Sequence, residues 1–176
     1  MSENDNWYPE RPPQFADAGD FEAVIFGSDR PLTNGAKGYS YAAFAIRRKG
    51  DHEYHYGVAS SRGDSEEYRG YIAAIVAVTE ALPAKSSAIV TTHNKTLATI
   101  FKEWLPGWEA NGWKKADKKP PAAVEILQRY WAVKRERQLN LAFEHVARND
   151  WRFGGVFNRL SGTIQRFVEK QFPERP

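Results

Sequence analysis

The order of strand-type and helix-type hydrophobic patterns most constrains what this chain can fold into. Three short runs rich in β-forming residues come first, separated by turn residues that include Gly27, Pro31 and Gly50. Residues 67–82 then switch to apolar side chains at every third or fourth position, and Pro83 ends that helical pattern. A strand, two helical stretches, another strand and a last helix follow, so the patterns predict the order βββαβααβα.

The predicted elements lie within one domain. The predicted strands cover residues 21–26, 38–48, 53–58, 88–92 and 139–146. The predicted helices cover residues 67–82, 95–104, about 121 to 137, and 156–170. We assign residues 21–172 to the domain and residues 173–176 to a tail.

Composition limits the class of protein. The 176 residues are 41% hydrophobic and 14% aromatic, which provides one sizeable core and excludes both a disordered chain and a multi-domain machine. Cysteine is absent, which excludes disulfides, thiolate zinc sites and a cysteine nucleophile. The longest apolar run, residues 71–78, is far shorter than the roughly 20 residues that span a bilayer, and the first ten residues do not read as a signal peptide. We expect a cytoplasmic protein without a membrane span.

Charge is unevenly distributed along the chain. The first 30 residues hold seven acidic residues and two arginines; since the net charge is +3, the rest of the chain carries +8. Residues 1–20 contain three prolines and few aliphatic residues, so we predict an acidic, disordered leader that contributes nothing to the core. A basic body suits phosphate backbones, and the leader could either solubilise the chain or compete for that basic surface.

Three segments carry a resemblance to a known family. They are WLPGWEANGWKKADKKP at residues 104–120, AAIVAVTEAL at 73–82 and AIVTTHNKTL at 88–97. Together with the element order, they resemble type I ribonuclease H in its bacterial form over about residues 21–170. The resemblance implies an α/β ribonuclease H-like fold: a five-stranded mixed sheet (βββαβααβα) with flanking helices and a basic handle-like excursion.

The resemblance also implies an active site that this sequence lacks. The family hydrolyses the RNA strand of RNA/DNA hybrids with two divalent metal ions held by clustered carboxylates, the ligands that magnesium prefers. The positions that correspond to those carboxylates and to the catalytic-loop histidine hold other residues: Ser28, Gly70, His93, Arg159 or Ser161, and Asn149 near the histidine position. The resemblance therefore implies a pseudoenzyme with no metal site and no cofactor.

A rebuilt metal site is the alternative within the same fold. Asp29, Glu67 and Asp150 could supply carboxylates for Mg²⁺ or Mn²⁺. Asp29 is one residue from Ser28, however, and successive strand residues point to opposite faces of a sheet. Precise two-metal geometry rarely survives relocation of every ligand, so we expect no metal there. His93 is expected to be a hydrogen-bonded structural residue.

The handle-like segment is the predicted nucleic-acid surface. Its candidate contacts are Trp113, Lys114, Lys115, Lys118 and Lys119. We expect Trp113 to be more accessible than Trp104 and Trp108, whose helical spacing suggests packing between helices. Glu66 and Glu67 correspond to asparagines that face the hybrid's minor groove in the family, which weakens the case for hybrid binding in the family's manner.

Three functions follow from these observations. The first is a catalytically inactive ribonuclease H-like module that binds nucleic acid, with RNA/DNA hybrid as one candidate, without cleaving it. The second is a protein-interaction or scaffold module, which the acidic leader and the two glutamates favour. The third is an active hybrid-specific nuclease with a rebuilt site. The sequence leaves the type of nucleic acid, any protein partner and the oligomeric state open.

Overall fold

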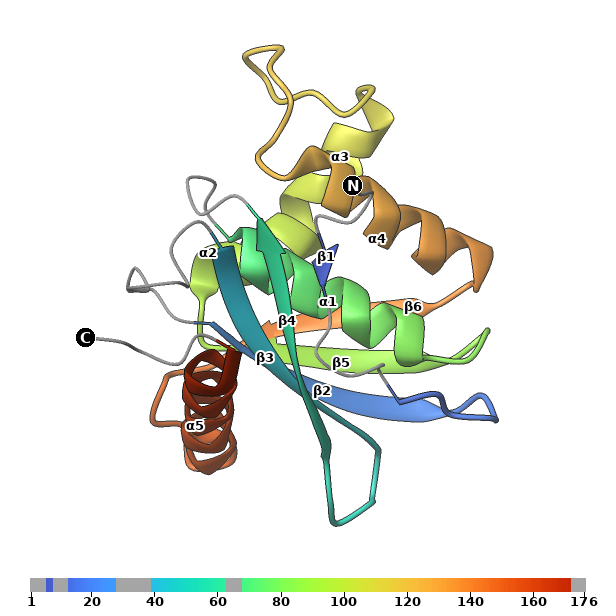
Figure 1. Ribbon diagram of the computed structural model, residues 1–176. Coiled ribbons are helices and arrows are strands. Elements are labelled where there is room, and N and C mark those ends of the chain that lie inside the picture. The colour runs from blue at the N-terminus through green and yellow to red at the C-terminus, as the bar shows by residue number, and fades with distance from the viewer. Residues whose placement is uncertain (1–5, 8–12, 28–38, 63–67, 172–176) are drawn as a thin grey trace, which may run out of the picture.

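A mixed β-sheet with helices on both faces forms the body of the protein. The computed structural model describes residues 6–7, 13–27, 39–62 and 68–171 of the chain (Figure 1). The strands are β1 (Asn6–Trp7), β2 (Asp20–Gly27), β3 (Tyr39–Arg48), β4 (His55–Arg62), β5 (Ser87–Thr92) and β6 (Asn140–His145). The helices are α1 (Arg69–Ala81), α2 (Lys95–Thr99), a π-helical turn (Ile100–Trp104), α3 (Leu105–Ala110), α4 (Val124–Glu136) and α5 (Gly154–Gln171).

The strand order is β1-β4-β3-β2-β5-β6. Strands β2, β3 and β4 pair antiparallel, whereas β5 is parallel to both β2 and β6. The five predicted strands and the mixed sheet are confirmed. Because β2 and β5 are parallel, their carboxyl ends reach the same edge of the sheet, where the first turn of α1 also lies. We call this place, formed by Gly27, Thr92 and the first turn of α1, the carboxyl edge.

Successive side chains along each strand point to opposite faces of the sheet, so a hydrophobic core forms on each face. Ala23 and Ile25 of β2 belong to the core shared with α1 and α4, whereas Val24 and Phe26 belong to the core under α5. Figure 1 shows α1 and α4 on one side of the sheet and α5 on the other. The two cores hold the carboxyl edge between rigid layers.

The helical stretch after β5 is longer than predicted. It begins where the Asn94 side chain accepts a hydrogen bond from the Leu97 N–H at 2.9 Å, a regular N-cap. It continues through the π-helical turn into α3, six residues beyond the predicted end at Trp104. Pro106 does not stop it, because a proline is tolerated in the first turn of the new α-helical segment.

Part of the predicted leader contacts the domain. Asn6 and Trp7 pair with Ser61 and Ser60 and add β1 to the sheet. Phe15 packs against the core, with its ring centroid 4.8 Å from that of Phe21. The expectation that residues 1–20 add nothing to the core is therefore wrong at Phe15. Within the described part of the chain, no helix has the length and apolar character needed to cross a membrane.

Candidate functional site

The start of α1 is pressed against β3 at Gly70. A Cβ atom at this position would lie 2.7 Å from the backbone nitrogen of Tyr41 and 2.9 Å from the carbonyl carbon of Ser40. Real Cβ atoms essentially never approach backbone atoms so closely, and backbone cannot move aside as a flexible side chain can. Gly70 therefore permits a close helix–strand contact that leaves no room for a glutamate side chain.

Tyr71 closes the end of β2. It is 5% exposed, and its hydroxyl donates a buried hydrogen bond of 2.8 Å to the carbonyl oxygen of Gly27. The ring lies 2.7 Å from where a Cβ of Gly27 would be, so only glycine leaves space for it. The tyrosine and the glycine thus fill the end of the strand that leads to the position of the first expected carboxylate.

Aromatic rings and an arginine form a stack at the end of β5. The His93 ring lies on that of Phe26, with centroids 4.9 Å apart and an angle of 24° between the planes, and meets the edge of Phe157 at 5.3 Å. The guanidinium of Arg148 lies 4.9 Å from the Phe26 centroid and 5.8 Å from that of Phe157. We call these four residues the aromatic–arginine stack. His93 therefore contacts two aromatic rings, one stacked and one edge-on.

The donors described at this edge do not fit a two-magnesium site. Such a site needs several carboxylate oxygens, and the described residues contain no group of three or more His, Asp or Glu side chains that could hold a metal ion. Gly70 has no donor, the Tyr71 hydroxyl is bonded to Gly27, and His93 is stacked. Ser28, Asp29 and Glu67 lie outside the described residues.

Asp150, the remaining carboxylate of the rebuilt-site alternative, is engaged in its own loop. Its Oδ1 accepts hydrogen bonds from the backbone N–H groups of Arg152 at 2.8 Å and Phe153 at 3.2 Å. Desolvation raises the pKa of Asp150, but these hydrogen bonds and the Arg152 charge lower it below its ordinary value overall. An ion pair of 3.4 Å to Arg152 completes the arrangement. Asp150 therefore caps the turn before α5.

Three other predicted positions lie on the segment between β6 and α5 or on α5 itself. Asn149 is exposed in the loop before the helix, and Ser161 is half-buried on it. Arg159 places its guanidinium 4.5 Å from the ring centroid of Tyr56, in β4, which β3 separates from β2. The structure therefore does not bring Arg159 to the carboxyl edge.

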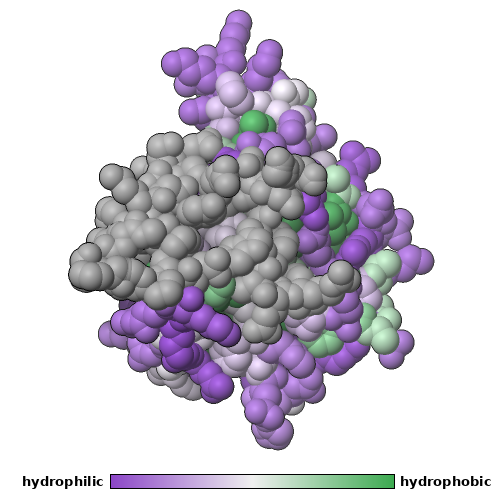
Figure 2. Space-filling view, in the orientation of Figure 1, coloured by the Kyte–Doolittle hydropathy of each residue, from purple (hydrophilic) through white to green (hydrophobic). Residues whose placement is uncertain are grey.

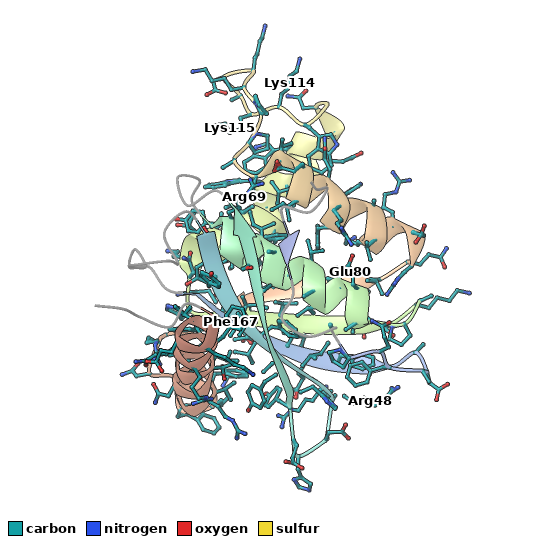
Figure 3. All side chains as sticks on the ribbon, in the orientation of Figure 1. Arg48, Arg69, Glu80, Lys114, Lys115 and Phe167 are labelled. Carbon is teal, nitrogen blue, oxygen red and sulfur yellow. The ribbon has the colours of Figure 1, made fainter. Side chains whose placement is uncertain are left out.

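The handle, residues 104–120, presents lysines on a loop that hydrogen-bonds to itself. The Lys115 N–H donates to the Lys119 carbonyl and the Lys118 N–H to the Lys115 carbonyl, both at 2.9 Å. Asp117 accepts from the Lys119 N–H at 2.9 Å and lies 3.8 Å from the Lys115 ammonium. Lys114, Lys118 and Lys119 are exposed, and Lys115 is half-buried. In Figure 2 the handle tip projects at the top as hydrophilic residues, and Figure 3 labels Lys114 and Lys115 there.

The handle tryptophans differ from expectation. Trp113 is half-buried against the core and meets Trp131 edge to face at 6.4 Å, because its backbone N–H donates to the Trp108 carbonyl and turns the chain inward. Trp108 packs against the core as expected, but Trp104 is 46% exposed. The prediction that Trp113 is more accessible than Trp104 is wrong. Trp151, which no sequence motif singles out, is 89% exposed between charged neighbours.

Comparison with known proteins places the chain in a family. No family model matches it. It is similar to ribonuclease H of Escherichia coli O127:H6 (strain E2348/69 / EPEC), with 32% identity over 119 residues, which are 67% of this chain and 73% of that protein. The chain belongs to the ribonuclease H family.

Solved ribonuclease H structures share the fold. LC9-RNase H1, a type 1 RNase H with the type 2 active-site motif, matches with a TM-score of 0.53 and 14% identity over 75% of this chain and 65% of that one. The foamy viral protease-reverse transcriptase in complex with an RNA/DNA hybrid matches with a TM-score of 0.58 and 16% identity, over 80% of this chain and 19% of that one. The ribonuclease H-like fold that the resemblance implies is confirmed.

Proposed function

We propose that this ribonuclease H-family protein binds nucleic acid and does not cleave it. The proposal depends above all on the carboxyl edge. Gly70 leaves no space for a carboxylate, and the Tyr71 hydroxyl is bonded to the Gly27 carbonyl at 2.8 Å. Two-metal hydrolysis needs clustered carboxylates to hold the ions and to stabilise the developing charge. Filling this place with rings and backbone removes that chemistry.

The handle supports the binding half of the proposal. Its lysines project from a loop that is already ordered by its own hydrogen bonds, so little backbone entropy is lost when they meet a phosphate backbone. Each lysine that neutralises a phosphate releases a counterion, which makes such binding salt-dependent. RNA/DNA hybrid is the first ligand to test, because a solved relative of the same fold is bound to one.

One titration tests both halves. The purified full chain is titrated with labelled RNA/DNA hybrid, double-stranded DNA and single strands at two salt concentrations, and the same mixtures with Mg²⁺ or Mn²⁺ are run on a gel. We expect binding that weakens as salt rises and no cleavage. The variant with glutamine at positions 114, 115, 118 and 119 is expected to bind at least tenfold more weakly, since about four phosphate contacts are lost.

Two other outcomes would replace the proposal. If no nucleic acid binds, the protein is a scaffold on a ribonuclease H fold, and the acidic residues Glu66 and Glu67 become the first candidates for a protein contact. If the protein cleaves hybrid when Mg²⁺ or Mn²⁺ is added, a rebuilt site exists. Substituting Asp29, Glu67 and Asp150 one at a time would then locate that site.

A further inference from the structure

At the carboxyl edge, Arg148 is a cation that forms no ion pair with any described residue. Arg148 is exposed, and the interaction that fixes its guanidinium besides the two rings is a hydrogen bond of 2.9 Å from Nη2 to Oδ1 of Asn158, a neutral side chain. Among the described residues, no carboxylate oxygen lies within 4.0 Å of it. The family pattern puts negative charge at this edge, and this chain puts a positive charge there.

The carboxylates closest to Arg148 in sequence are committed elsewhere. Asp150 accepts two backbone hydrogen bonds and pairs with Arg152 at 3.4 Å. Glu144 lies 3.8 Å from the same arginine and accepts a hydrogen bond from the Thr91 hydroxyl at 3.3 Å. Arg152 therefore offsets the negative charge of its neighbours, and the field of Arg148 is left to act on solvent or on a ligand.

We infer that Arg148 binds a backbone phosphate of the nucleic acid directly, at the carboxyl edge and without a bridging divalent ion. The inference rests on the proposed function and deepens it by naming a second contact point, at the edge of the sheet and apart from the handle. Phe26 and Phe157 hold the guanidinium within 6 Å of their rings, a cation–π arrangement. One N–H bonds to Asn158, which leaves the others of the planar fork free to pair with phosphate oxygens.

The fixed positive charge of Arg148 favours a phosphate over a metal ion at this place. A cation that is fixed in space repels Mg²⁺ and attracts the anion that Mg²⁺ would otherwise bridge. Since the rings and Asn158 already restrict the arginine, ordering its side chain on binding costs little. The His93 ring also stacks on Phe26, the ring that supports Arg148. This role needs no charge on His93.

The test compares two variants that each remove one positive charge, from arginines in different surroundings. The variant R148Q is measured against R166Q, which removes an exposed arginine of α5 whose hydrogen bond is to Thr163 within the same helix. Affinity of the full chain for labelled RNA/DNA hybrid is read by fluorescence anisotropy across a salt series, in EDTA and again in Mg²⁺. Thermal melting of each variant shows whether it is folded.

We expect the unmodified protein to bind at least as tightly in EDTA as in Mg²⁺, because Mg²⁺ competes for the phosphates and is not needed for the contact. R148Q should bind about five- to tenfold more weakly, and its plot of log affinity against log salt should be shallower by about 1, whereas R166Q changes affinity less than about twofold. R148K should recover the salt slope and part of the affinity, because it keeps the charge and loses the fork. N158A should weaken binding about two- to threefold without changing the slope, since it removes only the group that orients Arg148.

Each contrary result identifies what failed. If the unmodified protein binds hybrid and R148Q matches R166Q in affinity and slope, the phosphate contact at Arg148 is refuted and the proposed function stands. Binding that needs Mg²⁺ refutes the direct contact as well. If the unmodified protein binds no nucleic acid at all, the proposed function itself fails, and the inference fails with it.

Discussion

The carboxyl edge and the handle are the two regions that the family resemblance singles out, and the structure packs them in opposite ways. At the edge, Gly70, Tyr71 and His93 are buried or stacked, and the described residues there form a packed surface. In the handle, the lysines stand on an exposed turn that bonds to itself. The two regions therefore differ in exposure: side chains fill the carboxyl edge, whereas the handle leaves its lysines mostly in solvent.

A physical reason favours this outcome once metal binding is lost. Clustered carboxylates repel one another and raise each other's pKa, so without a bound cation they cost stability. Replacing them by ring packing and a buried hydrogen bond removes that repulsion and adds apolar burial. Lysines on an exposed loop carry little such cost, because solvent and salt screen them. Replacing the charged residues therefore raises the stability of the folded state more at the edge than in the handle.

The largest expected effect comes from restoring a carboxylate to the edge. G70E should lower the free energy of unfolding by about 3 kcal/mol or more, because its Cβ would overlap the backbone of Ser40 and Tyr41. G155E is the matched control: a Cβ there meets nothing within 4 Å, and its stability should change by less than about 0.5 kcal/mol. Urea denaturation measures both. Equal stability of the two variants would mean that the edge is not closed.

The next effect separates the handle tryptophans. W113A should cost about 2 kcal/mol of unfolding free energy, since the ring packs on the core and on Trp131. W104A should cost less than about 1 kcal/mol, because Trp104 is 46% exposed. Thermal melts in parallel test the difference. If W104A lost more unfolding free energy than W113A, the Trp113 ring would not be packed on the core.

Most of the fold could be predicted from the sequence, because the spacing of apolar residues and the residues that end helices and strands are local signals. The switch to helical spacing at residues 67–82 and the stop at Pro83 located α1 within two residues at its start and one at its end. The contribution of Phe15 could not be predicted, since it depends on contacts with Phe21 and Arg48 that only the folded chain brings together. Local pattern does not encode such tertiary contacts.

The site was predicted less completely, for a related reason. The absence of carboxylates at residues 70 and 93 was readable from the sequence, but what replaced them was not. Tyr71 looked like one more apolar helix residue, and its bond to Gly27 spans 44 positions of the chain. Arg148 carries no sequence motif that would single it out. Its position over Phe26 and Phe157 follows from the packing of α5 on the sheet.

A smaller effect, on binding, tests whether the handle acts as a surface. K118Q/K119Q should weaken binding to RNA/DNA hybrid about tenfold and reduce the salt slope by about 2, since two phosphate contacts are lost. K49Q/K85Q makes the same change in charge at two exposed lysines outside the handle, and should alter affinity less than twofold. Anisotropy across a salt series distinguishes them. Equal losses would show that net charge, and not the handle, attracts the nucleic acid.

The smallest effect comes from removing a single hydroxyl group at the carboxyl edge. Y71F removes one hydroxyl and keeps the ring, so it should lower the free energy of unfolding by about 1 kcal/mol, the usual worth of a buried hydrogen bond. Y56F is the control, because its ring packs under Arg159 and no hydrogen bond of its hydroxyl is part of the described structure. It should change stability by less than about 0.5 kcal/mol. Urea denaturation measures both variants, and a Y71F protein as stable as Y56F would mean that the bond to Gly27 adds nothing to the folded state. A measurable loss at Tyr71 alone would show that the place where the family has its metal ligands contributes to the stability of this fold.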